Sequence, residues 1–135
     1  MYMKKIVSVL MAASLLTACS RDKDAVAPAS PAVGFWKGTY GINSANSPYV
    51  YAVLFRANGT MRIYANQADT ALADKAEGNY VMEADQSGFE GSYQYAGSPK
   101  TYYFNGLFNA GKTTVNGTWI ENGTATTGTY LLSRQ

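Results

Sequence analysis

A glycine followed two positions later by an aromatic residue recurs along most of this 135-residue chain. In a β-strand, residues two apart share a face, so each glycine lies on the same side as its aromatic partner. Glycines on the inner face of a closing sheet allow sharp coiling and leave space for a large ring from a neighbouring strand. The repeat predicts a coiled sheet with an aromatic interior, and it occurs at Gly34-Phe35-Trp36, Gly38-Thr39-Tyr40, Gly78-Asn79-Tyr80, Gly91-Ser92-Tyr93, Gly106-Leu107-Phe108, Gly117-Thr118-Trp119 and Gly128-Thr129-Tyr130.

Turn-forming residues divide residues 33–135 into short strands. Asn58-Gly59 and Asn122-Gly123 each lie between two apolar runs, and both pairs suit a tight type I′ hairpin turn. The segment 66–76, rich in Ala and Asp, fits either a short helix or a long loop. Strands are expected near 33–41, 48–57, 60–65, 77–84, 88–96, 101–108, 113–121 and 125–133.

The expected strands alternate between an apolar face and a polar face, which is typical of an antiparallel sheet with one buried side. We predict an all-β fold, an antiparallel up-and-down meander of about eight strands closed into a small β-barrel, because closure removes exposed sheet edges. A β-sandwich of the same strands is the alternative. Five outward residues would form an apolar patch for a protein or glycan partner if they cluster, namely Leu54, Tyr64, Tyr103, Leu107 and Ile120.

The first nineteen residues have the layout of an export signal. Lys4 and Lys5 form a short positive region, and the apolar stretch 6–16 is shorter than the roughly 20 residues that span a bilayer. The following Leu16-Thr17-Ala18-Cys19 resembles the lipobox of bacterial lipoproteins. In that family the cysteine thiol takes a diacylglycerol, a peptidase cuts before the cysteine, and the new N-terminus is usually acylated. The resemblance implies a lipoprotein signal peptide at 1–18 and lipidation of Cys19.

The residues after the lipobox indicate a tether and a location. Residues 19–32 comprise the lipidated cysteine and a flexible stretch of charged and small residues, stiffened by Pro28 and Pro31. Many Gram-negative lipoproteins that stay in the inner membrane have Asp after the cysteine, whereas this chain has Ser20. The resemblance therefore implies a lipid anchor in the cell envelope, at the outer membrane, on its periplasmic side or at the cell surface.

The domain at 33–135 resembles the small lipocalin-like lipoproteins. The resemblance is carried by Gly34-Phe35-Trp36-Lys37-Gly38, which is similar to the Gly-x-Trp of the first lipocalin strand, and by the later Gly-Thr-Trp and Gly-Thr-Tyr strands. The chain departs from that family in having no clear C-terminal helix and no second cysteine. A lipocalin-like domain implies a β-barrel that binds a small hydrophobic or amphipathic molecule.

Residues for catalysis are scarce. The chain has no histidine, which removes the usual general base, zinc ligand and triad member, and the lone Cys19 is consumed by the lipid. Without Lys4 and Lys5, 9 basic residues remain against 9 acidic ones, so no basic field for nucleic acid is expected. We predict a protein that is not an enzyme, without cofactor or metal. The remaining carboxylates are interpreted as solvated charges beside turns, namely Asp69, Asp74, Glu77, Glu83 and Asp85.

Tyrosine is unusually abundant, with 11 residues against 5 phenylalanines. A tyrosine ring is apolar, but its hydroxyl needs a partner when buried. The first functional hypothesis is a binding module that holds a small amphipathic ligand at a barrel mouth lined by Tyr and Trp. The alternative is a protein-interaction or inhibitor lipoprotein of the envelope, with a solid core, that acts through its loops and outward patch. Candidate ligand contacts are Trp36, Tyr51, Tyr80, Tyr93, Tyr102 and Trp119.

Overall fold

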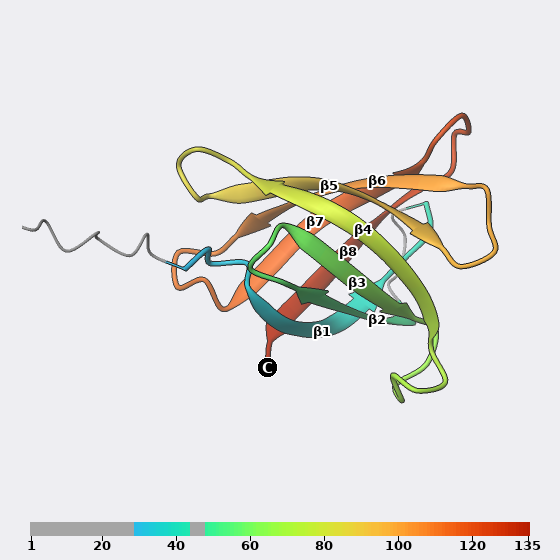
Figure 1. The fold of residues 1–135 in the computed structure, drawn as a ribbon, viewed down its shortest axis with the longest axis horizontal. Coiled ribbons are helices and arrows are strands. Elements are labelled where there is room, and N and C mark those ends of the chain that lie inside the picture. Colours follow the sequence, from blue (N-terminus) through green and yellow to red (C-terminus); the bar gives the residue numbers. More distant parts are fainter. Residues whose placement is uncertain (1–28, 44–47) are drawn as a thin grey trace, which may run out of the picture.

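The structure, a computed structural model, describes residues 29–43 and 48–135. The expected signal peptide, Cys19 and most of the expected tether lie outside the described residues. The strands are β1 (Gly34–Tyr40), β2 (Tyr49–Phe55), β3 (Thr60–Ala65), β4 (Asp74–Met82), β5 (Gly88–Tyr95), β6 (Thr101–Phe108), β7 (Thr114–Glu121) and β8 (Thr127–Arg134). They pair antiparallel in sequence order, and β1 also pairs with β8, so the sheet closes (Figure 1). The predicted all-β up-and-down barrel is confirmed, and the alternative β-sandwich does not form.

The segment 66–76 resolves into a loop and the start of a strand. Asp69 organises the loop, since its main-chain oxygen accepts hydrogen bonds from the N–H groups of Leu72 (3.1 Å) and Ala73 (3.0 Å). Its carboxylate also accepts a hydrogen bond from Ala71 N–H (2.8 Å). β4 then begins at Asp74, which pairs with Ala65, three residues earlier than expected. Of the two interpretations, the loop is right and the helix is wrong.

The two Asn-Gly pairs form turns, but not of the predicted type. A type I′ turn needs positive φ at both central residues. Only the glycines have it, with φ of 79° at Gly59 and 77° at Gly123, whereas neither asparagine does. At the first turn the Gly59 N–H donates to the Arg56 carbonyl (3.2 Å), which makes Ala57 and Asn58 the central residues and leaves Gly59 as the left-handed residue after the turn. The type I′ prediction is therefore wrong, because the first loop is one residue longer and the second loop two residues longer than it assumes.

Glycines pair with large aromatic residues on the neighbouring strand. Gly38 pairs with Tyr51, and Gly128 pairs with Trp119. A Cβ at Gly128 would overlap the Gly41 carbonyl oxygen and lie 2.6 Å from the indole nitrogen of Trp119. The predicted role of the inward glycines, which is to make space for neighbouring rings, is thus supported at Gly128, whereas a Cβ at Gly38 would overlap the Leu131 carbonyl oxygen on β8.

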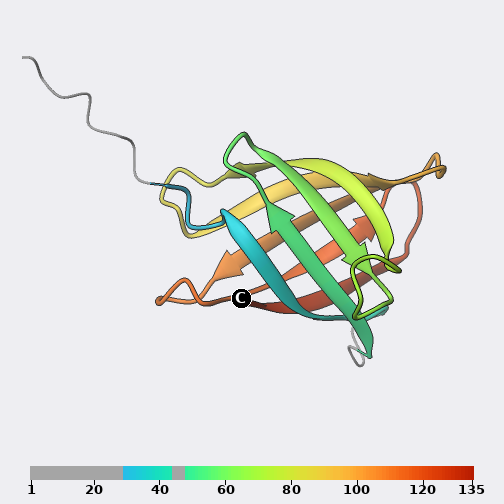
Figure 2. The ribbon, with the colours of Figure 1, turned by 60° about the horizontal axis from the view of Figure 1, so that its bottom comes forward.

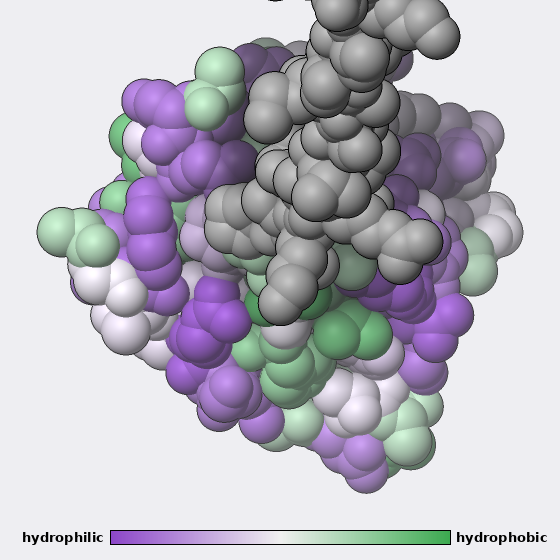
Figure 3. All heavy atoms as spheres, turned by 60° about the vertical axis from the view of Figure 1, so that its left-hand side comes forward, coloured by the Kyte–Doolittle hydropathy of each residue, from purple (hydrophilic) through white to green (hydrophobic). Residues whose placement is uncertain are grey.

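The barrel has two different ends. One end, which we call the base, holds the start of β1 and the C-terminus (Figure 2). Figure 3 looks toward the base, whose visible surface is largely hydrophilic around a small hydrophobic area. The opposite end carries the loops that follow β1, β3, β5 and β7. The base, the opposite end and the outer wall are therefore three separate candidate surfaces for function.

The base is sealed by Trp36 and by the residues just before β1. The Trp36 indole N–H donates to the carbonyl of Ala32 (2.7 Å), and both residues are fully buried. The Arg134 guanidinium lies 4.6 Å from the Trp36 ring centroid and donates to the carbonyls of Val33 (3.0 Å) and Pro31. The expected tether boundary at residue 32 is therefore wrong. Residues 31–33, which we call the base strap, belong to the domain because they supply the acceptors that Trp36 and Arg134 need.

Candidate functional site

The end opposite the base opens into an aromatic cavity of about 630 Å³. Strand ends position its rings, because residues two apart on each strand point to the same inner face. Asn66, Asp74 and Glu121 supply polar groups at its rim. We call this cavity the tyrosine mouth, and its rings are those of Tyr40, Tyr51, Tyr93, Tyr95, Tyr102 and Trp119.

The rings of the tyrosine mouth pack against one another at varied angles. Tyr93 and Tyr102 stack, with centroids 5.2 Å apart and planes 10° apart. Tyr95 stands nearly perpendicular to both, at 87° to Tyr93 and 84° to Tyr102. Trp119 meets Tyr40 and Tyr102 with centroids 6.2 and 6.1 Å apart. Stacked and edge-to-face ring pairs of this kind are energetically favourable, so mutual packing holds the rings of the lining in defined positions.

A chain of hydrogen bonds fixes one side of the rim. The Tyr40 hydroxyl donates to Asn66 Oδ1 (2.6 Å), and Asn66 Nδ2 donates to the Asp74 carboxylate (2.6 Å). Asn66 has a φ of 70°, a left-handed conformation that asparagine tolerates, and its N–H donates to the Val50 carbonyl (2.9 Å). The loop after β3 therefore holds a carboxylate and a phenol at fixed places beside the rings.

The hydroxyl of Tyr51 is exceptional. Tyr51 is only 2% exposed, and no described residue makes a hydrogen bond of ordinary geometry with its hydroxyl. The Tyr93 hydroxyl is near enough for a hydrogen-bond interaction with Tyr51 to shift the pKa of both phenols, although no hydrogen bond of ordinary geometry joins them. The buried hydroxyl of Tyr130, by contrast, donates to the Asn105 carbonyl (2.7 Å).

Four phenols of the mouth are held neutral. Burial raises the pKa of Tyr51, Tyr93 and Tyr95 above its ordinary value. Neighbouring phenols raise the pKa of Tyr51 and Tyr95 further, whereas at Tyr93 the hydrogen bond with Tyr51 partly offsets the effect of burial. Burial also raises the pKa of Tyr40, with smaller contributions from neighbouring groups that include the Asp74 carboxylate. At physiological pH the hydroxyl groups of these four tyrosines can therefore both donate and accept hydrogen bonds.

Most charged side chains at the rim form an ion pair or hydrogen bonds with other residues. Glu121 is buried at 7% exposure, and its carboxylate pairs with the Lys100 ammonium at 2.7 Å. This hydrogen bond raises the pKa of Lys100. The Lys75 ammonium donates to the carbonyls of Ala71 (2.8 Å) and Ala73 (3.4 Å), so it is directed at the loop main chain.

Four of the six predicted ligand contacts come together in the tyrosine mouth, namely Tyr51, Tyr93, Tyr102 and Trp119. The other two do not line it, and their expected position at the mouth is wrong. Trp36 is buried in the base, where Ala32 and Arg134 hold it. Tyr80 contacts Phe55 with centroids 4.8 Å apart and donates its hydroxyl to the Arg56 carbonyl (2.7 Å) in the turn after β2.

Sequence analysis missed several residues of the mouth. Tyr40 and Tyr95 follow the period-two pattern of their strands, so the same alternation that selects Tyr93 could have selected Tyr95. Glu121 lies two residues after Trp119, on the inner face, and its charge masked that position. Asn66 and Asp74 come from the loop after β3, where no periodic pattern exists to identify them.

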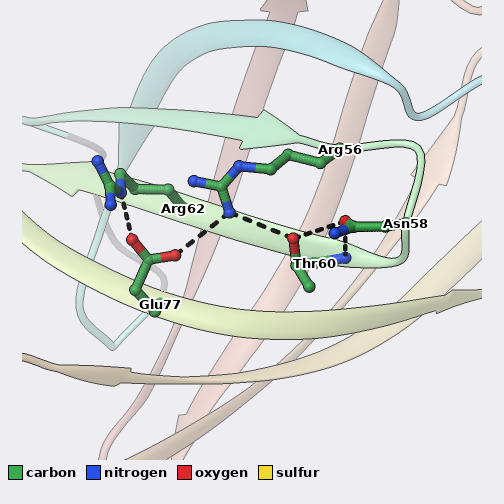
Figure 4. Close-up of polar contacts among 5 residues, drawn as sticks. All are labelled: Arg56, Asn58, Thr60, Arg62 and Glu77. Atoms are coloured by element: carbon green, nitrogen blue, oxygen red, sulfur yellow. Dashed lines mark hydrogen bonds and ion pairs between the residues drawn. The ribbon is translucent and has the colours of Figure 1, made fainter.

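The outer wall carries a small charged cluster across β2, β3 and β4. Glu77 accepts hydrogen bonds from Arg62 and from Arg56 (3.3 Å), and Arg56 also reaches Thr60 (Figure 4). Burial opposes ionisation of Glu77, but the hydrogen bonds from Arg62 and Arg56 outweigh it and lower the pKa of the carboxyl. The side chains remain about 33 to 54% exposed, so the cluster stabilises the wall only weakly.

A second depression, of about 920 Å³, lies on the outer face of β4 to β7. Val81, Tyr103, Leu107 and Ile120 line it, and all are exposed. Tyr103 and Ile120 are paired across β6 and β7. Three of the five predicted outward residues therefore cluster here, while Leu54 and Tyr64 lie on β2 and β3.

No group of three or more residues able to hold a metal ion occurs among residues 29–43 and 48–135. Within the same ranges, no helix has the length and apolarity needed to cross a membrane.

Comparison with known proteins is informative for the fold only. No protein-family model matches the chain, and no curated protein matches it. Among solved structures, a redesigned β-barrel is similar, with a TM-score of 0.61 and 14% sequence identity over 79% of this chain and 94% of that chain. The chain thus has the fold of a closed antiparallel β-barrel that it shares with a designed protein.

Proposed function

We propose that this chain is a lipid-anchored binding protein of the bacterial envelope, not an enzyme, that holds a small amphipathic molecule in its tyrosine mouth. The proposed anchor rests on Leu16-Thr17-Ala18-Cys19, with its single cysteine. The proposed binding function rests on one observation, the buried Tyr51 hydroxyl without a hydrogen-bond partner at the aromatic cavity.

An unpartnered buried hydroxyl costs free energy in the empty protein. Leaving a buried donor or acceptor unsatisfied costs about 1–3 kcal/mol. The remaining buried side-chain nitrogen and oxygen atoms of the described residues all have partners, so Tyr51 is the exception in an otherwise satisfied core. Because Tyr51 borders the mouth, a polar group of a bound molecule could supply the missing hydrogen bond.

The lining defines the kind of molecule. Six aromatic rings offer a large apolar surface, and their neutral hydroxyls offer a few hydrogen bonds at defined places. A ligand that is mostly apolar with one or two polar groups matches both features. The cavity of about 630 Å³ is within the range of small-molecule sites.

Native mass spectrometry of the chain purified from its own envelope tests this function, with organic extraction of the same sample. We expect a reproducible extra mass that leaves on denaturation. As a matched comparison, the double substitution of Tyr93 and Tyr102 with Phe keeps the rings and removes two hydroxyls, and it should lower ligand retention more than thermal stability. A clean ligand-free mass that persists after incubation with host lipid extract would contradict the proposal.

A second candidate function is favoured by the outer depression. Val81 is 73% exposed and Leu107 is 57% exposed, and they share one concave surface with Tyr103 and Ile120. Exposed apolar groups gathered in one depression are typical of an interaction surface. The proposed partner is another protein of the envelope, which this chain would bind as an inhibitor binds its target.

Site-specific photo-crosslinking tests the second candidate. A photoreactive residue at Val81 should give a discrete adduct, and Leu107→Ser should abolish it. A photoreactive residue at Thr39, on the outer face of β1, serves as the matched control. Equal adducts from both positions would show nonspecific contact and contradict the interaction surface.

A further inference from the structure

The outer depression over β4 to β7 combines exposed apolar side chains with negative charge that has no counter-charge. Glu83 and Glu90 line it, and no lysine or arginine is among the described residues that do so. The Glu83 carboxylate accepts a hydrogen bond from the Ser87 hydroxyl (2.7 Å), and neither carboxylate forms an ion pair within the described ranges. Glu90 lies directly opposite Val81 across β5 and β4. The depression therefore presents net negative charge beside apolar groups.

The opposite side of the barrel carries the opposite charge. Strands β2 and β6 are four strands apart in the closed ring of eight, so their outer faces point away from each other. On the β2 side, Arg56 and Arg62 share the single carboxylate of Glu77, which leaves one positive charge in excess (Figure 4). Lys37, on the outer face of β1, adds another, because it forms no ion pair within residues 29–43 and 48–135.

Apolar groups accompany these positive charges. Leu54 lies opposite Arg62 across β2 and β3, and opposite Phe35 across β2 and β1. The rings of Phe35 and Tyr64 meet edge to face, with centroids 6.1 Å apart. Charge is therefore placed beside an apolar residue here, as it is in the depression. We call this surface the basic face, and it consists of Phe35, Lys37, Leu54, Arg56, Arg62 and Tyr64.

Complementary surfaces on opposite sides of one domain suit a contact between copies of the chain. The depression of one copy attracts the basic face of the next, whereas two depressions or two basic faces repel each other. A contact between two different surfaces is heterologous, so it repeats from copy to copy and does not close as a symmetric pair. Both surfaces lie on the side of the barrel, so the contact leaves the base and the tyrosine mouth uncovered.

We propose that the chain assembles head to tail with copies of itself, with the outer depression of one copy on the basic face of the next. The inference goes beyond the proposed ligand-binding function of the mouth and does not depend on it. Its occupant for the depression is a second copy in place of a different envelope protein. Copies related in this way can stand side by side with all their bases on one side, which is compatible with the proposed lipid anchor.

Two variants, each defective in one surface, test the proposal. Glu83→Gln with Glu90→Gln neutralises the depression and keeps the basic face, and Lys37→Gln with Arg62→Gln does the reverse. Native mass spectrometry of the full chain, purified from its own envelope in detergent, should show dimers and larger species for the parent chain and monomers for each variant alone. An equimolar mixture of the variants, one of them tagged, should form mixed dimers and nothing larger, because only one complementary pair of surfaces remains.

Two controls show that the surfaces themselves are responsible. Asp85→Asn, in the turn between β4 and β5, removes a charge that does not line the depression and should leave the dimer fraction of the parent chain unchanged. Raising ammonium acetate from about 50 mM to about 500 mM should lower the dimer fraction, because salt screens attraction between exposed charges. Mixed dimers from two variants that are monomeric alone would also show that both variants fold.

The outcomes separate this inference from the proposed functions. Mixed dimers support the head-to-tail contact. A monomeric parent chain, dimers that persist in either variant alone, or a mixture that stays monomeric overturns it. A photo-crosslink from Val81 to a different protein, with no chain-to-chain adduct, also overturns it and favours the second candidate function. Ligand retention in the mouth should be the same in the parent chain and both variants, so the proposed binding function stands or fails independently.

Discussion

Tyr51 and Tyr130 are neighbouring phenols in one core with opposite hydrogen-bonding situations. Their rings lie 5.8 Å apart, and both residues are 2% exposed. The Tyr130 hydroxyl donates to the Asn105 carbonyl at 2.7 Å, whereas the Tyr51 hydroxyl has no partner among the described residues. Removing each hydroxyl should therefore change stability in opposite directions.

Tyr51→Phe should raise the free energy of unfolding of the ligand-free chain by about 1 kcal/mol, because it removes an unsatisfied buried group. Tyr130→Phe should lower it by about 1 kcal/mol, because it removes a hydrogen bond and leaves a carbonyl short of a donor. Urea denaturation of both variants beside the parent chain measures the difference. A loss of stability in Tyr51→Phe equal to that in Tyr130→Phe would mean that Tyr51 is bonded in solution.

At the scale of the strands, a glycine on one strand is paired with an aromatic residue on the neighbouring strand. Gly117 pairs with Tyr130 on β8, and a Cβ there would overlap the carbonyl oxygen of Asn105 and lie 2.8 Å from the Tyr130 hydroxyl. Gly111 lies in the connection between β6 and β7, and the nearest atom to a Cβ there is Thr113 Oγ1 at 3.8 Å. A side chain at Gly117 would therefore collide with the neighbouring strand, whereas one at Gly111 would meet no close atom.

Gly117→Ala should lower the free energy of unfolding by about 1–3 kcal/mol, because the added methyl overpacks the wall against main-chain atoms. Gly111→Ala, the matched control, should stay within about 0.5 kcal/mol of the parent chain. Thermal unfolding followed by circular dichroism compares them. Similar melting temperatures for both variants would show that the sheet can relax around the new side chain.

The strands were predictable because period-two patterning and the Gly-x-aromatic repeat act locally. Trp119 and Tyr93 could be assigned to the interior from their neighbours alone. Which end of the barrel each ring reaches depends on strand register, and for that reason Trp36 and Tyr80 were misplaced at the mouth. The Asn66–Asp74 contact joins a left-handed loop residue to a strand end, and this depends on tertiary pairing that no single-sequence pattern encodes.

At the scale of the whole molecule, ring contacts run without interruption from the base to the mouth. Several of these rings lie in the base half of the interior, and the cavity lies where the run reaches the mouth. The expected solid core and the expected ligand site therefore occupy different halves of one barrel. The connected rings are Trp36, Phe108, Phe89, Phe104, Tyr93 and Tyr102.

Stability should fall steeply above pH 10. Burial raises the pKa of Tyr51, Tyr93, Tyr95 and Tyr130 in the folded chain above the value of about 10 expected when unfolded. The folded state therefore holds these protons more tightly, so this stabilisation is complete below pH 10 and is lost as the pH rises further. Absorbance at 295 nm should show these phenols ionising together with unfolding, and their gradual titration in a chain that stays folded would contradict the burial.

The base strap determines at which end of the barrel the preceding chain leaves the domain. Arg134 and Trp36 donate hydrogen bonds to the carbonyls of residues 31–33 at the base. The chain therefore leaves the domain at the end opposite the tyrosine mouth. Between Cys19 and Ser30 the chain can extend at most about 40 Å. A domain held by lipid at Cys19 would be attached to the bilayer through its base, with the tyrosine mouth at the opposite end of the barrel. The mouth would then be the part of the domain farthest from the point of attachment, and cargo would be exchanged with the surrounding water.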